Sequence, residues 1–98
     1  MEIFTLFVVY KAKPGKARAF VEELEKNKIA EKVRNEDGCL RYDYFFQDGN
    51  ADEVVLMEEW TSEEKQKIHV TQPHMAELRK ISNANIESVR LFTAYLRR

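Results

Sequence analysis

The sequence predicts a single α+β domain of the ferredoxin-like class, in which the elements follow the order β-α-β-β-α-β and the strands form one antiparallel sheet. Segments rich in β-branched and aromatic residues lie at 2–12, 39–47, 53–60 and 86–96. Segments with helical periodicity separate the first strand from the second and the third from the fourth. The chain has 98 residues without a linker or a repeat, which indicates that residues 1–98 form one domain.

Residues 2–12 (EIFTLFVVYKA) predict a central strand that is buried on both faces. Apolar side chains occupy both alternating sets, with Phe4, Leu6, Val8 and Tyr10 on one side and Ile3, Phe7 and Val9 on the other. The helices of this fold cover only one face of the sheet. A second copy of the chain is the simplest cover for the other face, so we expect a homodimer.

The first helix is expected over residues 16–34, after a Pro-Gly break. Its apolar face consists of Ala17, Phe20, Val21 and Leu24. Asn27 and Lys28 then fall where apolar residues are due, which predicts either a bend or a polar group aimed inward. If Asn27 is aimed inward, it lines a pocket; otherwise it belongs to the surface of the helix.

A β-hairpin is expected from residues 39–47 and 53–60, which are joined by a turn at Asp48-Gly49-Asn50. The apolar face of its first strand consists of Leu40, Tyr42, Tyr44 and Phe46. A buried tyrosine hydroxyl needs a hydrogen-bond partner. Tyr42 and Tyr44 are therefore either packing residues or donors to a bound carbonyl group.

The second helix is expected to open with a capping box of Thr61 and Glu64 and to be interrupted at Pro73. A further turn or two carries the apolar residues Met75, Leu78 and Ile81. Residues 82–85 (SNAN) are expected to break this helix, and residues 86–96 form the last strand.

The composition excludes several classes of protein. Sixteen basic and seventeen acidic residues leave a net charge of −1, and no basic cluster of the kind that binds nucleic acid is present. The longest apolar run, residues 3–10, is too short to span a membrane, and the start of the chain lacks a basic signal-peptide region. The lone Cys39 cannot form an internal disulfide, and we interpret it as structural. We expect a soluble cytoplasmic domain.

The two histidines of the chain, His69 and His74, lie on either side of Pro73. Histidine is the side chain whose ordinary pKa lies nearest to neutral pH. His69 is either a general base, a group that orients a ligand, or a partly exposed helix residue; His74 is either a capping or packing residue or part of a site. Their spacing is not the i,i+4 spacing of a helical zinc pair, and no carboxylate or thiolate accompanies them in the sequence. No metal site is therefore expected.

Glu58 and Glu59 precede Trp60 at the end of the third strand. They point to opposite faces, so one of the two is expected to turn inward and to pair with Arg41 or Arg90. Trp60 is either a core residue or the wall of a pocket beside the histidines.

With these features the chain resembles the antibiotic biosynthesis monooxygenase family over roughly residues 2–96. The matching segments are Lys13-Pro14-Gly15, Glu36-Asp37-Gly38-Cys39, Glu58-Glu59-Trp60, His69 and Thr71-Gln72-Pro73-His74-Met75. Within the family it looks most similar to the small quinol monooxygenases and to the autoinducer-processing branch. Asp37 stands where the family usually has Pro, a change without an obvious consequence for a pocket.

The resemblance implies a dimeric α+β barrel in which two sheets pack face to face and each subunit holds a pocket between its sheet and its helices. It implies a cofactor-independent monooxygenase that oxidises a small aromatic quinol- or phenol-like substrate with O2. His69 is then the catalytic base, and Trp60, Asn27, Tyr44 and His74 bind the substrate. No cofactor and no metal are expected; the partners are the substrate, O2 and a second copy, with no nucleic acid and no membrane.

Two other functions stay open. One is an isomerase or processing enzyme for a small phosphorylated signal molecule, and the other is a non-catalytic dimeric ligand-binding or stress-response domain; a shared fold does not decide among them. Haem degradation is not expected. That branch of the family uses an Asn on the first strand, a Trp on the second helix and a haem-ligating His one helix later. Here the first strand lacks Asn, His69 takes the Trp position, and Arg79 stands near the position of the ligating His.

Overall fold

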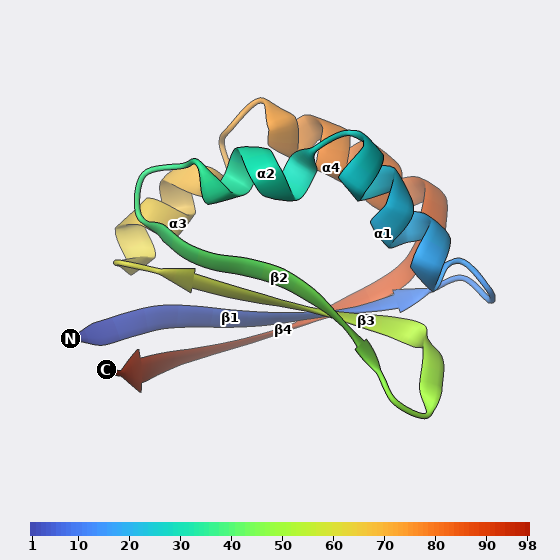
Figure 1. The fold of residues 1–98 in the computed structure, drawn as a ribbon, viewed down its shortest axis with the longest axis horizontal. Helices are drawn as coiled ribbons and strands as arrows, with labels where there is room; N and C mark the ends of the chain where they lie inside the picture. Colours follow the sequence, from blue (N-terminus) through green and yellow to red (C-terminus); the bar gives the residue numbers. More distant parts are fainter.

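The computed structural model describes residues 1–98 and confirms the ferredoxin-like α+β class (Figure 1). The elements are β1 (Glu2–Ala12), α1 (Ala17–Lys26), α2 (Ile29–Arg34), β2 (Cys39–Gln47), β3 (Asn50–Trp60), α3 (Glu63–His69), α4 (His74–Asn85) and β4 (Ile86–Arg97). Each predicted helix is thus divided in two. None of the helices has the length and apolar character needed to cross a membrane.

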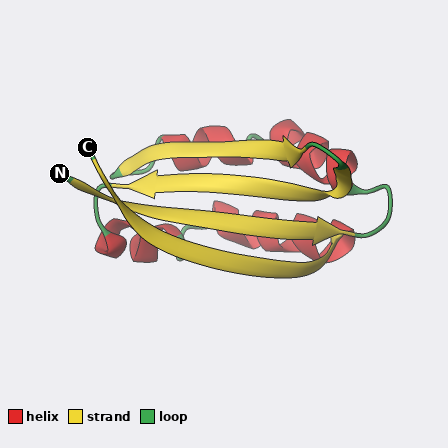
Figure 2. Cartoon of the chain, turned by 90° about the horizontal axis from the view of Figure 1, so that it is seen from below, coloured by secondary structure: helices red, strands yellow, loops and turns green.

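The four strands form one antiparallel sheet in the order β2-β3-β1-β4. In the middle of the sheet, Val8 of β1 lies opposite Leu56 of β3 and Leu91 of β4. All the helices lie on one face of this sheet (Figure 2). β1 is therefore a central strand, which accounts for its nearly continuous apolar sequence.

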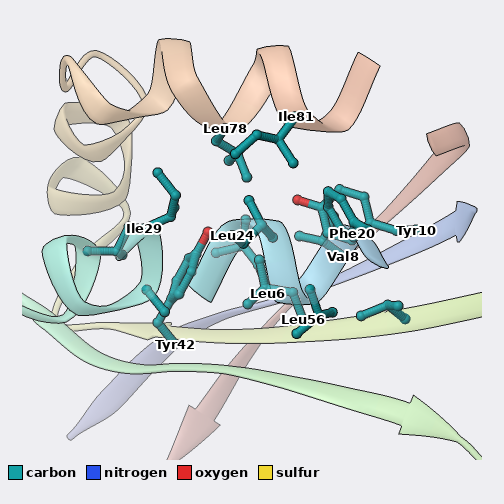
Figure 3. Close-up of a cluster of buried hydrophobic side chains, with 14 of the residues drawn as sticks. Leu6, Val8, Tyr10, Phe20, Leu24, Ile29, Tyr42, Leu56, Leu78 and Ile81 are labelled. Carbon is teal, nitrogen blue, oxygen red and sulfur yellow. The ribbon is translucent and has the colours of Figure 1, made fainter. Parts of the chain in front are cut away.

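The core lies between the sheet and the helices. Figure 3 shows the ring of Tyr42 rising from the sheet between Ile29 and Leu24. Phe20, Leu24 and Ile29 have no exposed surface, and full burial of a side chain of this size stabilises the fold by about 1.5–3 kcal/mol. α2 packs against both β2 and α4. This packing brings the turn that follows α2 next to the start of α4.

The first helical segment bends at Asn27 and Lys28. Of the two alternatives that the sequence left open, a bend or a polar group aimed inward, the structure has the bend. The side-chain amide of Asn27 donates to the carbonyl of Glu23 at 2.8 Å, and α1 ends there. Lys28 adopts a left-handed conformation with φ of 57°. The bend rotates α2, so that Ile29 and Val33 are both fully buried although they are out of phase with α1.

Two boundaries of the second helical segment differ from the predictions. α3 is capped by Ser62 and not by Thr61, because the Ser62 hydroxyl accepts a hydrogen bond from the amide of Lys65 at 3.2 Å. α4 continues through Asn85, so the predicted break at residues 82–85 is wrong. The buried Asn85 amide donates to a carbonyl one turn earlier at 2.9 Å and to a carboxylate of α1 at 3.1 Å. These tertiary contacts outweigh the weak helix propensity of the segment.

The start of β2 also departs from simple alternation. Leu40 was predicted to face inward, but it is 47% exposed. The register against β3 shifts between Cys39 and Arg41, so Cys39 packs against the core in its place. Burial raises the pKa of the Cys39 thiol to about 11, which agrees with a structural role.

No helix covers the other face of the sheet. Ile3 and Val9 on this outer face are already buried within the chain, but Phe45 and Phe92 are 46% and 51% exposed. The outer face therefore keeps exposed aromatic surface. Its cover by a second copy stays a prediction.

Candidate active site

The two histidines meet at the break between α3 and α4. His69 is the last residue of α3, and His74 is the first residue of α4. Pro73 cannot continue the preceding helix, because it lacks an amide hydrogen, but it suits the start of a new one. The chain turns between the two helices, and both imidazole rings reach the same group.

That group is the carboxylate of Glu36, in the turn between α2 and β2. Its Oε2 atom lies 2.9 Å from His69 Nδ1 and 2.6 Å from His74 Nε2, and its Oε1 atom lies 3.1 Å from His69 Nδ1. A carboxylate accepts hydrogen bonds, so each neutral ring places its proton on the nitrogen that faces Glu36. His69 then carries a free lone pair on Nε2.

The Nε2 side of His69 faces the interior. This atom lies 3.8 Å from Glu58 Oε1, and Glu58 Oε1 accepts a hydrogen bond from Trp60 Nε1 at 3.0 Å. The Trp60 ring lies over the imidazole with 4.7 Å between centroids, and the Tyr42 ring approaches it edge-on at 5.9 Å. His69 is only 1% exposed. Its orientation is thus fixed on all sides.

Glu58 is a buried carboxyl group without a guanidinium or ammonium partner. Burial raises its pKa, against the opposing effects of the Trp60 hydrogen bond and of His69. Glu58 therefore lies beside the Nε2 side of His69 as a second titratable group in the interior.

Two tyrosine hydroxyls beside Glu58 and His69 lack a well-formed hydrogen bond. The hydroxyls of Tyr42 and Tyr44 are buried; they interact with each other, but neither makes a hydrogen bond of good geometry. Burial raises the pKa of both, so both stay protonated donors at neutral pH. An unsatisfied buried donor costs about 1–3 kcal/mol. The two hydroxyls mark a place where a polar atom of a ligand would be favourable.

Glu59 lies on the outer face and is only 1% exposed. It is 3.5 Å from Nε of Arg41, and it also pairs with the guanidinium of Arg98. The predicted pairing of the inward-facing glutamate is therefore wrong, because Arg41 pairs with the outward-facing Glu59, and Arg90 pairs with Glu53 at 3.5 Å. Both glutamates at the end of β3 are buried, not one as predicted.

The structure brings most of the predicted site residues together, namely His69, His74, Trp60 and Tyr44. Tyr44 joins the cluster through Tyr42, whose ring it contacts at 5.8 Å between centroids. Asn27 lies outside this buried cluster, because its amide donates to the end of its own helix, although it lines a surface groove together with His74.

Glu36 is the residue that the sequence reasoning missed, and the statement that no carboxylate accompanies the histidines is wrong. Glu36 lies 33 residues before His69, so no local spacing connects the two. The only indication was that Glu36 opens one of the segments that match the family.

Three hollows are open to the surface. One of about 160 Å³ lies beside Glu36 and Lys65, and one of about 530 Å³ lies beside His74 and Asn27. The third, of about 700 Å³, lies near Arg18 at the hairpin end of β2 and β3. None of the three is lined by Trp60 or by the unpartnered tyrosines. Side chains must therefore move before a ligand reaches the inner side of His69.

Comparison with known proteins gives the family. Residues 3–81 match the model of the antibiotic biosynthesis monooxygenase family, and the chain belongs to this family. The match runs from β1 into α4, so it contains Glu36, Glu58, Trp60 and both histidines.

Individual relatives are distant. The uncharacterized protein YjcS of Bacillus subtilis (strain 168) is 29% identical over 63 residues, which span 64% of this chain and 60% of YjcS. PA3566 from Pseudomonas aeruginosa superposes with a TM-score of 0.86 at 23% identity, over 100% of this chain and 97% of that one. Rv0793 from Mycobacterium tuberculosis has a TM-score of 0.79 at 22% identity, over 94% and 92% of the two chains. At these identities the likeness of the structures establishes the fold.

Proposed function

We propose that this protein is a monooxygenase that oxidises a small aromatic quinol- or phenol-like substrate with O2 and without a resident cofactor. The observation that supports it is the buried imidazole of His69, which Glu36 holds through Nδ1 while Nε2 faces the interior. A carboxylate that fixes the tautomer and orientation of a histidine is a recurrent way to present a general base.

In the proposed reaction, His69 Nε2 accepts the proton of a substrate hydroxyl. The resulting anion is electron-rich, and one of its ring carbons bonds to O2 to give a peroxide. Loss of water from the peroxide leaves one oxygen atom as a carbonyl group of the product, and the other atom leaves in the water. The substrate supplies all the electrons, so the reaction balances without another reductant.

The neighbouring side chains have distinct roles in this proposal. The hydroxyls of Tyr42 and Tyr44 donate to the substrate oxyanion, which satisfies the two donors that lack partners. Trp60 provides an apolar wall against His69. Asn27 has no part, because its amide is already engaged.

The active form in this proposal is a homodimer with the two outer faces packed together. Phe45 and Phe92 supply exposed aromatic surface at that face. Sedimentation at micromolar concentration is expected to give a species of about twice 11.6 kDa. A protein that sediments only as a monomer would contradict the dimer but leave the chemistry of the interior unaffected.

Oxygen consumption with a reduced naphthoquinone tests the activity, after subtraction of autoxidation measured without protein. His69→Ala should lose about 10²–10⁴-fold in rate, the usual effect of removing a general base. His74→Ala should lose much less, because Glu36 still orients His69. Equal rates for the wild type and His69→Ala would remove His69 from the mechanism and favour a ligand-binding domain.

A further inference from the structure

Glu36, His69 and His74 form a cluster with the chemistry of a metal site. Their three candidate ligand atoms all lie within 4.8 Å of one another, and they come from three different parts of the fold. Each histidine nitrogen lies 2.6–3.1 Å from an oxygen of Glu36. Adjacent ligands of an octahedral ion at about 2.1 Å are about 3.0 Å apart, and those of a tetrahedral ion are about 3.4 Å apart. The distances from each histidine nitrogen to Glu36 are therefore already close to those between adjacent metal ligands.

We propose that Glu36, His69 Nδ1 and His74 Nε2 bind one divalent first-row transition metal ion, with Zn²⁺ as the simplest representative. Two imidazole nitrogens and one carboxylate oxygen are a donor set that suits zinc, cobalt, iron or copper. Magnesium and calcium prefer oxygen ligands and are not expected to bind here.

The surroundings of His69 support this assignment. Metal-binding histidines almost always donate their second N–H to a carboxylate, a carbonyl or a water. Glu58 lies on that side of the ring, with Oε1 3.8 Å from His69 Nε2, and a small movement would bring it within hydrogen-bond distance. The ring is already held between Trp60 and Tyr42, so little conformational freedom is lost when an ion binds.

Solvent reaches the cluster from two sides. The hollow beside Glu36 and the groove beside His74 both open to the surface, and they give an ion a path inward and leave coordination positions for water. The cation nearest the hollow is Lys65, and its ammonium group is paired with Asp37. Repulsion of an incoming metal ion is thereby reduced.

Occupancy of this site has a consequence for catalysis, and this consequence rests on the proposed function. With an ion on Nδ1 of His69, the proton of the neutral ring would lie on Nε2, which faces Glu58. The nitrogen that serves as the base then carries a proton. Metal binding and the role of His69 as a base exclude each other, so the ion acts as an inhibitor.

Calorimetric titration of the chelator-treated full chain with Zn²⁺ tests the site. One equivalent is expected to bind, and Mg²⁺ is expected to give no binding. Glu36→Gln and His74→Ala should each weaken binding by about tenfold or more, and Glu58→Gln by about 10–100-fold. Glu77→Gln is the matched control, because Glu77 lines the groove beside His74 without a bond to either histidine, and its loss should leave the affinity unchanged.

Circular dichroism of each variant separates a lost ligand from a lost fold, and His74→Ala, at the start of a helix, is the variant least expected to unfold.

As a second measurement, ¹⁵N NMR of the wild type should show the His69 proton move from Nδ1 to Nε2 when Zn²⁺ is added. Failure of the wild type to bind Zn²⁺ would overturn the site. Wild-type affinity for Zn²⁺ in folded Glu36→Gln and His74→Ala would overturn it as well.

Measurements of oxygen consumption separate the proposed metal site from the proposed monooxygenase activity. Zn²⁺ should abolish turnover by the wild type at the concentration at which it binds. A protein that binds Zn²⁺ but never consumes oxygen would contradict the proposed function and leave the metal site standing. Full turnover with one equivalent of Zn²⁺ bound would overturn the proposed inhibition.

Discussion

Glu58 and Glu59 are neighbours on β3, and both are buried, yet the fold treats them in opposite ways. Glu59 on the outer face pairs with the guanidinium groups of Arg41 and Arg98. Glu58 on the inner face has only the indole N–H of Trp60 at 3.0 Å and the imidazole of His69 at 3.8 Å. Burial raises the pKa of Glu58, and the Trp60 hydrogen bond and His69 offset only part of this rise.

The difference separates a structural role from a functional one. A buried carboxylate with two guanidinium partners is fully explained by the stability of the folded state. A buried carboxyl group that lacks such a partner makes folding less favourable, and groups of this kind concentrate at functional sites. The inner face of the β3 end is therefore the side on which chemistry is expected, and assembly through the outer face stays a proposal.

The largest expected effect concerns the carboxylate that orients the base. Glu36→Gln should lower kcat by about 10²–10⁴-fold, because an amide N–H facing Nδ1 favours the wrong tautomer of His69. Oxygen-consumption kinetics measure the loss, which should appear in kcat more than in KM. Glu77→Gln is a suitable control, since Glu77 lines the same groove as His74 and bonds to neither histidine. Equal losses in the two variants would contradict a specific role for Glu36.

Substitutions around Glu59 on the outer face should change the free energy of unfolding. The double variant Arg41→Ala/Arg98→Ala leaves Glu59 buried without a cation and should lower the free energy of unfolding by about 3–5 kcal/mol. Urea denaturation measures this loss. Adding Glu59→Gln to the double variant should restore much of it, because the uncompensated charge is removed. If the triple variant is no more stable than the double, the pairs do not neutralise Glu59.

The smallest effect is the pH dependence that Glu58 adds to stability. Its pKa is raised in the folded state, so the folded protein binds its proton more tightly than the unfolded chain does. The contribution of Glu58 to stability is therefore fully present below the ordinary carboxyl pKa and is lost as the pH rises through the folded-state pKa.

Urea denaturation of the wild type and of Glu58→Gln across this range measures the difference. The stability of the wild type relative to Glu58→Gln should fall as the pH rises and then level off. A relative stability that increases with pH would mean that Glu58 is paired as effectively as Glu59.

The content of β-branched and aromatic residues predicted the strands well, because such residues favour extended, buried segments. Residues 2–12 and 86–96 became β1 and β4 almost to the residue. Predictions failed where a distant contact decided the local structure. Asn85 stays helical through its bond to a carboxylate of α1, and Leu40 is exposed because the pairing of β2 with β3 shifts register.

The candidate site shows the same limit. The sequence identified His69, His74 and Trp60 because histidines are rare in this chain and because they lie close together along it. It could not identify Glu36, whose position depends on the packing of α2 against α4. A contact across 33 residues leaves no periodic pattern in the sequence.

The tautomer of His69 is the most direct test of the proposed base. ¹⁵N NMR of the histidine rings, in metal-free protein at a pH where His69 is neutral, distinguishes a protonated ring nitrogen from an unprotonated one. The bond to Glu36 requires the proton on Nδ1 and a bare Nε2 that faces Glu58 and Trp60. A proton on Nε2 of the neutral ring would contradict the proposal, because that nitrogen would then be unable to accept a proton from a substrate.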